Sequence, residues 1–151
     1  MSNLSVLLNG KIGNLFLNFE HNFKNDGITI LYGPNGSGKT TIFSALGGFI
    51  NNLETRILFN GNEIHDIDKY PPNKRPFGIM FQNPILFEHL SVEENLDFVL
   101  KRNQSNTQNK SLISKEYLIN QLELNSLLKR SPKNLSGGEK LRVVLARTIL
   151  K

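Results

Sequence analysis

The sequence predicts an α/β fold, and three observations support the prediction. Apolar and polar residues alternate through positions 4–8 and 15–19, a pattern typical of half-buried strands. A glycine-rich loop at 33–40 follows a short apolar, β-branched run and precedes a helical pattern. From residue 91 onward, apolar residues recur at helical spacing between polar loops. We therefore expect an N-terminal antiparallel sheet, a strand–loop–helix unit and a mostly helical remainder.

The first third of the chain should hold the strands nearest the glycine-rich loop. Residues 4–8 and 15–19 should pair as antiparallel strands joined by a turn at Asn9-Gly10-Lys11. Residues 28–32 should form a buried strand that enters the loop. The helix after the loop should bury one apolar face, made of Ile42, Ala45, Leu46 and Phe49.

Two further strands are expected before the helical part. Residues 56–61 should form a strand that ends in an Asn-Gly turn. The proline-rich run 71–76 should be a rigid, non-helical lead into a short buried strand at 77–81.

Capping motifs and periodicity predict the helices. Ser91-Val92-Glu93-Glu94 is a capping box that should open a helix through about Lys101. The polar stretch 103–111 should be a loop, followed by a helix at 115–122 and a short one near Leu127.

The last helix should begin after Pro132, at a second capping box formed by Ser136 and Glu139. Its buried face is expected to contain Leu141, Val144, Leu145 and Ile149.

Composition places the chain among globular domains and excludes several classes. At 151 residues, with 38% hydrophobic and 21% charged residues, it suits one domain. No apolar run approaches the ~18 residues of a membrane span, and no export signal opens the chain. The absence of cysteine excludes disulfides and thiolate metal sites. The net charge of +5 is dispersed, which favours a solvated basic face over nucleic-acid binding.

The glycine-rich loop predicts nucleoside triphosphate binding. It matches G-x-x-x-x-G-K-[ST] at every fixed position, and it reads Gly33-Pro34-Asn35-Gly36-Ser37-Gly38-Lys39-Thr40. Glycines let successive backbone N–H groups meet phosphate oxygens, and the following helix N-terminus adds further donors. Lys39 should reach the β- and γ-phosphates and the Thr40 hydroxyl should ligate Mg²⁺, so we expect a nucleoside triphosphate with Mg²⁺; the family resemblance described below implies that it is ATP. Thr41 either contributes to the site or is only a first-turn helix residue. A plain glycine-rich turn is the alternative.

A second motif follows about a hundred residues later. Leu135-Ser136-Gly137-Gly138-Glu139, continued by Lys140-Leu141-Arg142, resembles the signature of ATP-binding cassette (ABC) ATPases. The resemblance implies a P-loop NTPase with an N-terminal antiparallel β subdomain, a RecA-like core and a helical subdomain at about 83–134. It also implies a head-to-tail dimer with a second ATPase subunit. Ser136, Gly137 and Gly138 would then contact the γ-phosphate held by the partner's phosphate loop.

Phe81-Gln82 is similar to the family's Q-loop, which lies between the two stronger motifs. The resemblance implies that Gln82 joins Lys39 in catalysis and contributes to the Mg²⁺ and water environment. It also implies that residues 83–95 face the transmembrane permease. Taken alone, Gln82 would be an exposed polar residue at a strand end.

Within the family, the chain most resembles the ATP-binding subunits of molybdate importers. The similar stretches are 27–33, 72–82, 86–92 and the Gly138-Glu139-Lys140 form of the signature. The resemblance implies an ATP hydrolase peripheral to the cytoplasmic face of the plasma membrane, which serves a substrate-binding protein indirectly through the permease. Importers of thiamine, iron or polyamine, and soluble non-transport ABC ATPases, are the alternatives.

Two departures from the family pattern limit these expectations. No aromatic occupies residues 10–15, where members often stack adenine, and Phe16 is the nearest candidate. The chain ends at Lys151, before the expected apolar strand ending in Asp-Glu and the switch histidine. We therefore expect a fragment that binds ATP weakly and hydrolyses it little or not at all, because in the family the Asp organises Mg²⁺ and the Glu polarises the attacking water.

Overall fold

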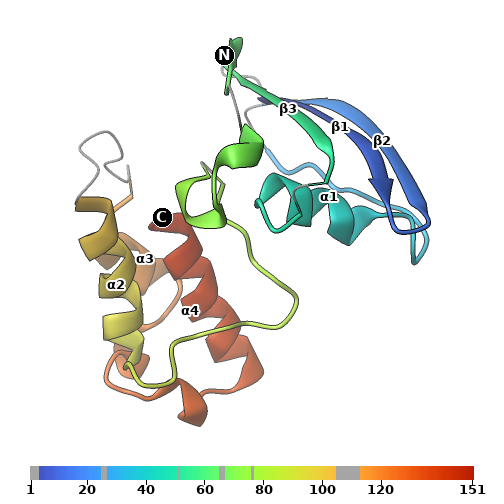
Figure 1. Cartoon of the computed structure of the whole chain (residues 1–151). Helices are drawn as coiled ribbons and strands as arrows, with labels where there is room; N and C mark the ends of the chain where they lie inside the picture. Colours follow the sequence, from blue (N-terminus) through green and yellow to red (C-terminus); the bar gives the residue numbers. More distant parts are fainter. Residues whose placement is uncertain (1–3, 25–26, 51, 65–66, 76, 105–112) are drawn as a thin grey trace. The chain divides into compact units, whose positions relative to one another are not determined.

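The computed structural model of the chain forms two compact units, residues 1–77 and 78–151 (Figure 1). It describes residues 4–24, 27–50, 52–64, 67–75, 77–104 and 113–151. Among these residues, no helix combines the length and apolar character that crossing a membrane requires.

An antiparallel sheet organises the first unit. Its strands lie in the order β2-β1-β3-β4. Their bounds are Leu4–Ile12 (β1), Leu15–Phe23 (β2), Glu54–Phe59 (β3) and Asn62–Glu63 (β4). The prediction that the first two strands pair is confirmed, and β1 also pairs with β3, with Val6 opposite Ile57.

The first hairpin turns later than the sequence predicts. Gly10 lies inside β1, opposite Leu17, and the chain reverses between Ile12 and Leu15. Gly13 has a φ of 57°, which suits the tight reversal there. A Cβ on Gly10 would lie 2.9 Å from the Leu53 side chain, so Gly10 marks a close approach within the sheet rather than a turn. The second expected turn is confirmed, since Asn60 and Gly61 have φ angles of 55° and 77° between β3 and β4.

Helix α1 (Lys39–Leu46) belongs to the same hydrophobic core as the sheet. Its buried side chains Ile42, Ala45 and Leu46 confirm most of the predicted face. Phe49 lies beyond the end of the helix and is 52% exposed, so its predicted burial is wrong. The buried residues of this core are Val6, Leu8, Leu17, Ile42, Ala45, Leu46, Leu53, Ile57 and Ile67.

Residues 28–32 and 77–81 are not strands in this structure, contrary to the prediction. The side chains of Ile28, Ile30 and Tyr32 are 93%, 81% and 95% exposed. A β-branched run becomes a strand only when a neighbour accepts its backbone hydrogen bonds, and no described strand pairs with either segment. The proline-rich lead also differs, because Pro72–Lys74 forms a 3₁₀ turn (η2) with proline at its tolerated first position.

Three helices build the described part of the second unit, which leaves out residues 105–112. They are α2 (Val92–Gln104), α3 (Lys115–Gln121) and α4 (Gly137–Ile149), drawn from yellow to red in Figure 1. The short turns η3 (Asn125–Leu127) and η4 (Pro132–Asn134) connect α3 to α4. All three predicted helices and the short one are confirmed, although α2 extends into the start of the predicted loop, and most of that loop lies outside the described residues.

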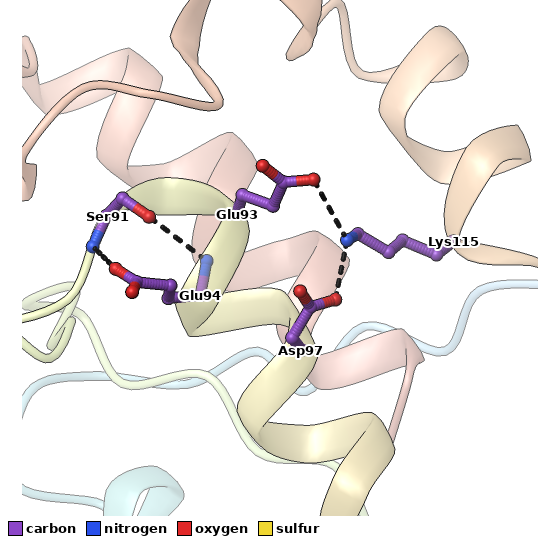
Figure 2. A network of polar contacts seen from close by, with 5 residues as sticks. All are labelled: Ser91, Glu93, Glu94, Asp97 and Lys115. Carbon is purple, nitrogen blue, oxygen red and sulfur yellow. Dashed lines mark hydrogen bonds and ion pairs between the residues drawn. The ribbon is translucent and has the colours of Figure 1, made fainter.

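A capping box and an ion network fix the start of α2 (Figure 2). The Ser91 N–H donates to Glu94 Oε2 at 2.7 Å, and the Glu94 N–H donates to Ser91 Oγ at 3.2 Å. Lys115 at the start of α3 contacts Asp97 at 2.5 Å and Glu93 at 3.6 Å. Burial lowers the pKa of the Lys115 ammonium, but its hydrogen bond to Asp97 and the two carboxylate charges outweigh burial and raise that pKa above its usual value.

Helix α4 buries a different face from the one predicted. Leu141, Leu145 and Ile149 are 43%, 36% and 38% exposed, so three of the four expected core positions are wrong. The residues that α4 buries are Val143, Val144 and Ala146, with Leu150 at its C-terminal cap. Because α4 carries apolar residues on more than one side, periodicity alone does not select its buried face. Its packing against α2 and α3 does.

Candidate nucleotide-binding site

The glycine-rich loop leads directly into α1 and needs its glycines for different reasons. Gly36 and Gly38 have φ angles of 81° and 91°, which disfavour any side chain. A Cβ on Gly33 would lie 2.9 Å from Ser37 Oγ, so a larger residue there would displace the Ser37 hydroxyl. Gly38 is the N-cap of α1 and supplies no side-chain hydrogen bond, which leaves the first-turn N–H groups to an outside acceptor.

Lys39 is held inside the loop by the loop's own backbone. Its Nζ donates to the carbonyl oxygens of Gly33 and Pro34, each at 2.7 Å. The Ser37 N–H also donates to the Pro34 carbonyl at 3.3 Å, which closes the turn. A bound phosphate would compete with these carbonyls for the same ammonium, so the charge is already placed where an anion is needed.

The two threonines after Lys39 lie in the first turn of α1. Thr40 is exposed, as a hydroxyl that ligates an incoming metal ion must be, and Thr41 is half-buried. The residues predicted for phosphate and metal binding from Gly33 to Thr41 thus lie together in the first unit.

Phe16 lies on the wrong side of its strand for the phosphate loop. A Cβ on Gly38 would lie 3.2 Å from Leu15 and 3.4 Å from Leu17, so these two β2 residues face the loop. Because side chains alternate along a strand, Phe16 points to the opposite face, where it is 68% exposed. The geometry therefore disfavours Phe16 as the residue that stacks on adenine.

Arg75 is a residue of this unit that sequence reasoning missed. Its side chain is 2% exposed, and it donates through NH1 to Ala45 O at 3.2 Å and Leu46 O at 3.5 Å, at the C-terminal end of α1. Nε donates to Tyr70 O at 3.0 Å. A Cβ on Gly48 would lie 2.6 Å from Arg75 Nε. A buried cation thus caps the helix whose other end forms the phosphate loop. In the sequence, the pair Gly47-Gly48 directly after α1 is the feature that could have indicated the close approach of Arg75.

The remaining predicted site residues lie in the second unit. Gln82 is exposed and outside any helix or strand. Ser136 is the N-cap of α4, where its Oγ accepts from the Glu139 N–H at 3.3 Å and Glu139 Oε2 accepts from the Ser136 N–H at 2.6 Å. The capping box confirms that the motif starts a helix. A capped helix start is compatible with the proposed role of the same residues as an ABC signature.

Gly137 and Gly138 have no structural reason within the described residues to be glycine. Both are exposed, neither has a positive φ, and a Cβ on either would meet no atom of the described chain within 4 Å. Glycine in a helix costs roughly 0.5–1 kcal/mol relative to alanine. Two such glycines at a helix N-terminus leave room for a group that approaches from outside this unit.

The two capping boxes should make the helices of the second unit sensitive to acid. Hydrogen bonds from the backbone and side chain of Ser136 lower the pKa of Glu139 below its usual value, and those of Ser91 do the same for Glu94. A lowered pKa in the folded state contributes stability above the unfolded pKa and loses it as pH falls through the folded value.

We therefore expect helix stability in this unit to fall below about pH 4.5, and Glu139→Gln to weaken this dependence at α4. Amide exchange across α4 between pH 3 and pH 6 measures it. An identical pH dependence in Glu139→Gln would contradict the assignment.

Comparisons with known proteins agree on one family. Residues 16–151 match the family model described as ABC transporter. The molybdenum import ATP-binding protein ModC of Saccharophagus degradans is 43% identical over 125 residues, which cover 82% of this chain and 34% of that protein. The Fe(3+) ions import ATP-binding protein FbpC of Fusobacterium nucleatum is 37% identical over 120 residues, covering 80% and 31%.

A solved structure supports the same fold. An ABC transporter ATP-binding protein from Pyrococcus furiosus is 25% identical with a TM-score of 0.69, over 98% of this chain and 70% of that one. This likeness confirms the predicted P-loop fold of ABC ATPases. The chain spans about a third of the length of the curated relatives it matches. From the extent of the family match and the identity to these relatives, the chain belongs to the ABC transporter family.

Proposed function

We propose that this chain is the nucleotide-binding part of the ATP-binding subunit of an importer, which couples ATP binding and hydrolysis to transport of molybdate or a similar oxyanion. The observation that carries the proposal is the phosphate loop, whose left-handed glycines, uncapped α1 N-terminus and inward lysine form an anion site. The similarity of the chain to import ATP-binding proteins supports the assignment of this anion site to an importer.

The signature residues complete the proposed site from a second copy. Ser136, Gly137 and Gly138 begin α4 with exposed backbone, and the glycines leave their surroundings open. In a head-to-tail dimer, this helix start would meet the γ-phosphate held by the partner's Lys39. ATP would thus join two ATPase subunits, which explains the otherwise costly glycines.

Thr40 and Gln82 carry the oxygen donors that suit Mg²⁺. Both side chains are exposed, and a hydroxyl and an amide oxygen are hard ligands. Mg²⁺ supplies charge neutralisation between the phosphates. Lys39 then orients the β- and γ-phosphates, and Gln82 orients the attacking water, so both act in hydrolysis by the complete gene product.

The proposed partners follow from the importer assignment. Residues 83–95 contact transmembrane permease subunits, within a helical subdomain at about 83–134, and a substrate-binding protein acts through the permease. The protein is then peripheral, at the cytoplasmic face of the plasma membrane. Its positive residues are dispersed along the sequence, which offers no basic tract to nucleic acid.

Substrate-stimulated ATP turnover tests the proposal. The complete gene product is assembled with its permease and binding protein, and turnover is compared with molybdate, sulfate, phosphate and thiamine. We expect molybdate to stimulate turnover more than the others. Stimulation by another substrate would refute the molybdate assignment and retain the importer assignment. If neither these substrates nor the ferric complex described next stimulates turnover, the importer assignment is contradicted.

Iron is the second candidate substrate, because an Fe(3+) ions import ATP-binding protein is 37% identical over 120 residues. Adding a ferric complex to the same comparison separates the two candidates.

A further inference from the structure

The segment after Gln82 is held by a buried asparagine. Residues 85–91 contain no helix or strand, yet their backbone is hydrogen-bonded to Asn95 of α2, which is 0% exposed. Asn95 Oδ1 accepts from the Phe87 N–H at 2.9 Å, and Nδ2 donates to the carbonyls of Phe87 at 3.1 Å and Leu90 at 3.3 Å. A single side chain therefore fixes both backbone groups of Phe87.

Arg147 of α4 also holds this segment, and it contacts Asn95 as well. Its NH2 donates to Ile85 O at 2.5 Å, and NH1 donates to Asn95 Oδ1 at 3.4 Å. The guanidinium carbon lies 5.2 Å from the centroid of the Phe87 ring, in cation–π range. Burial lowers the pKa of Arg147, but a guanidinium stays charged in proteins.

These contacts join residues 85–91 to α4, which we call the signature helix because it begins at the signature residues Ser136 and Gly137. Ser136 caps the start of α4 and Arg147 lies near its end, within one unbroken helix. A helix moves as a rigid rod, so a displacement at Ser136 reaches Arg147 and the segment that it holds. A lysine would keep the charge but lose the two-pronged donation and the stacking of the flat guanidinium.

We infer that Arg147 and Asn95 are positioning residues that couple the signature helix to residues 85–91, and so set how strongly the loaded permease stimulates ATP turnover. The inference rests on the proposed function, because it assumes that this segment contacts the permease. It adds to that function a named route from the composite nucleotide site to the partner surface.

The first test measures basal and substrate-stimulated turnover of the complete gene product with its permease. Arg147→Lys should lower the stimulated rate at least about fivefold, the low end of allosteric coupling, while basal turnover and ATP affinity stay within about twofold. The control is Lys129→Met, which removes an exposed cation of the same unit and should change neither rate. Equal loss of basal and stimulated turnover would show a merely structural role and overturn the inference.

The second test separates this inference from the importer proposal, because it needs no transported substrate. Amide exchange is measured in the complete gene product with and without Mg-ATP. In the wild type, Mg-ATP should change exchange at residues 85–91, and in Arg147→Lys this change should disappear while α3 exchanges as before. Phe87→Leu, which removes the aromatic ring but keeps an apolar side chain, should have the same effect. A wild type without the nucleotide-dependent change, or variants that retain it, would overturn the inference.

Discussion

Lys39→Ala is expected to weaken ATP binding about 100-fold. The ammonium donates to two loop carbonyls at 2.7 Å and is placed to exchange them for phosphate oxygens. A charge-assisted hydrogen bond contributes about 1.5–3 kcal/mol, and losing about 3 kcal/mol corresponds to roughly a hundredfold in affinity. Isothermal titration with ATP measures the loss.

The control for this variant is Lys74→Ala, which removes an exposed lysine of the same unit and should leave affinity unchanged. Folding should also change little, by about 1 kcal/mol or less, because water can replace the ammonium at the loop carbonyls. Equal affinities of the wild type and Lys39→Ala would contradict the role assigned to Lys39.

Arg75→Met should destabilise the first unit by about 2–4 kcal/mol. Methionine fills much of the same space, but it leaves the carbonyls of Ala45, Leu46 and Tyr70 without the donors that Arg75 provides. Urea unfolding measures this loss of stability, and amide exchange in β1 and β3 shows that it occurs in the first unit.

Arg56→Met is the matched control. Its ion pair with Glu63 at 3.2 Å joins side chains that are 60% and 38% exposed, so its loss should cost less than about 1 kcal/mol. If both variants lose similar stability, burial and helix capping do not make Arg75 more important to folding than the exposed Arg56. ATP affinity should fall with stability in Arg75→Met, because α1 carries the phosphate loop.

Local chemistry was predictable from the sequence where neighbouring residues determine it. Both capping boxes form as expected, because a serine and a glutamate three positions apart satisfy each other's backbone groups. The Asn60-Gly61 turn and the glycine-rich loop are likewise set by residues that tolerate positive φ.

Long-range contacts decide what the sequence did not predict. Ile28 to Tyr32 has the composition of a strand, but no described strand pairs with it. The buried face of α4 depends on α2 and α3 rather than on its own period. Arg75 lies about thirty residues from the carbonyls of α1, so nothing in its neighbourhood indicated burial. The site residues divide between two units, and their roles in one composite site remain a proposal.

Sedimentation of the complete gene product tests most directly the central claim that the loop and the signature of two copies enclose one triphosphate. With Mg-ATP under conditions that slow hydrolysis, we predict a dimer, and with ADP a monomer. Ser136→Arg should remain a monomer with ATP, although its own phosphate loop still binds the nucleotide. An ATP-dependent dimer that persists in Ser136→Arg, or a wild type whose mass does not change with ATP, would contradict the account.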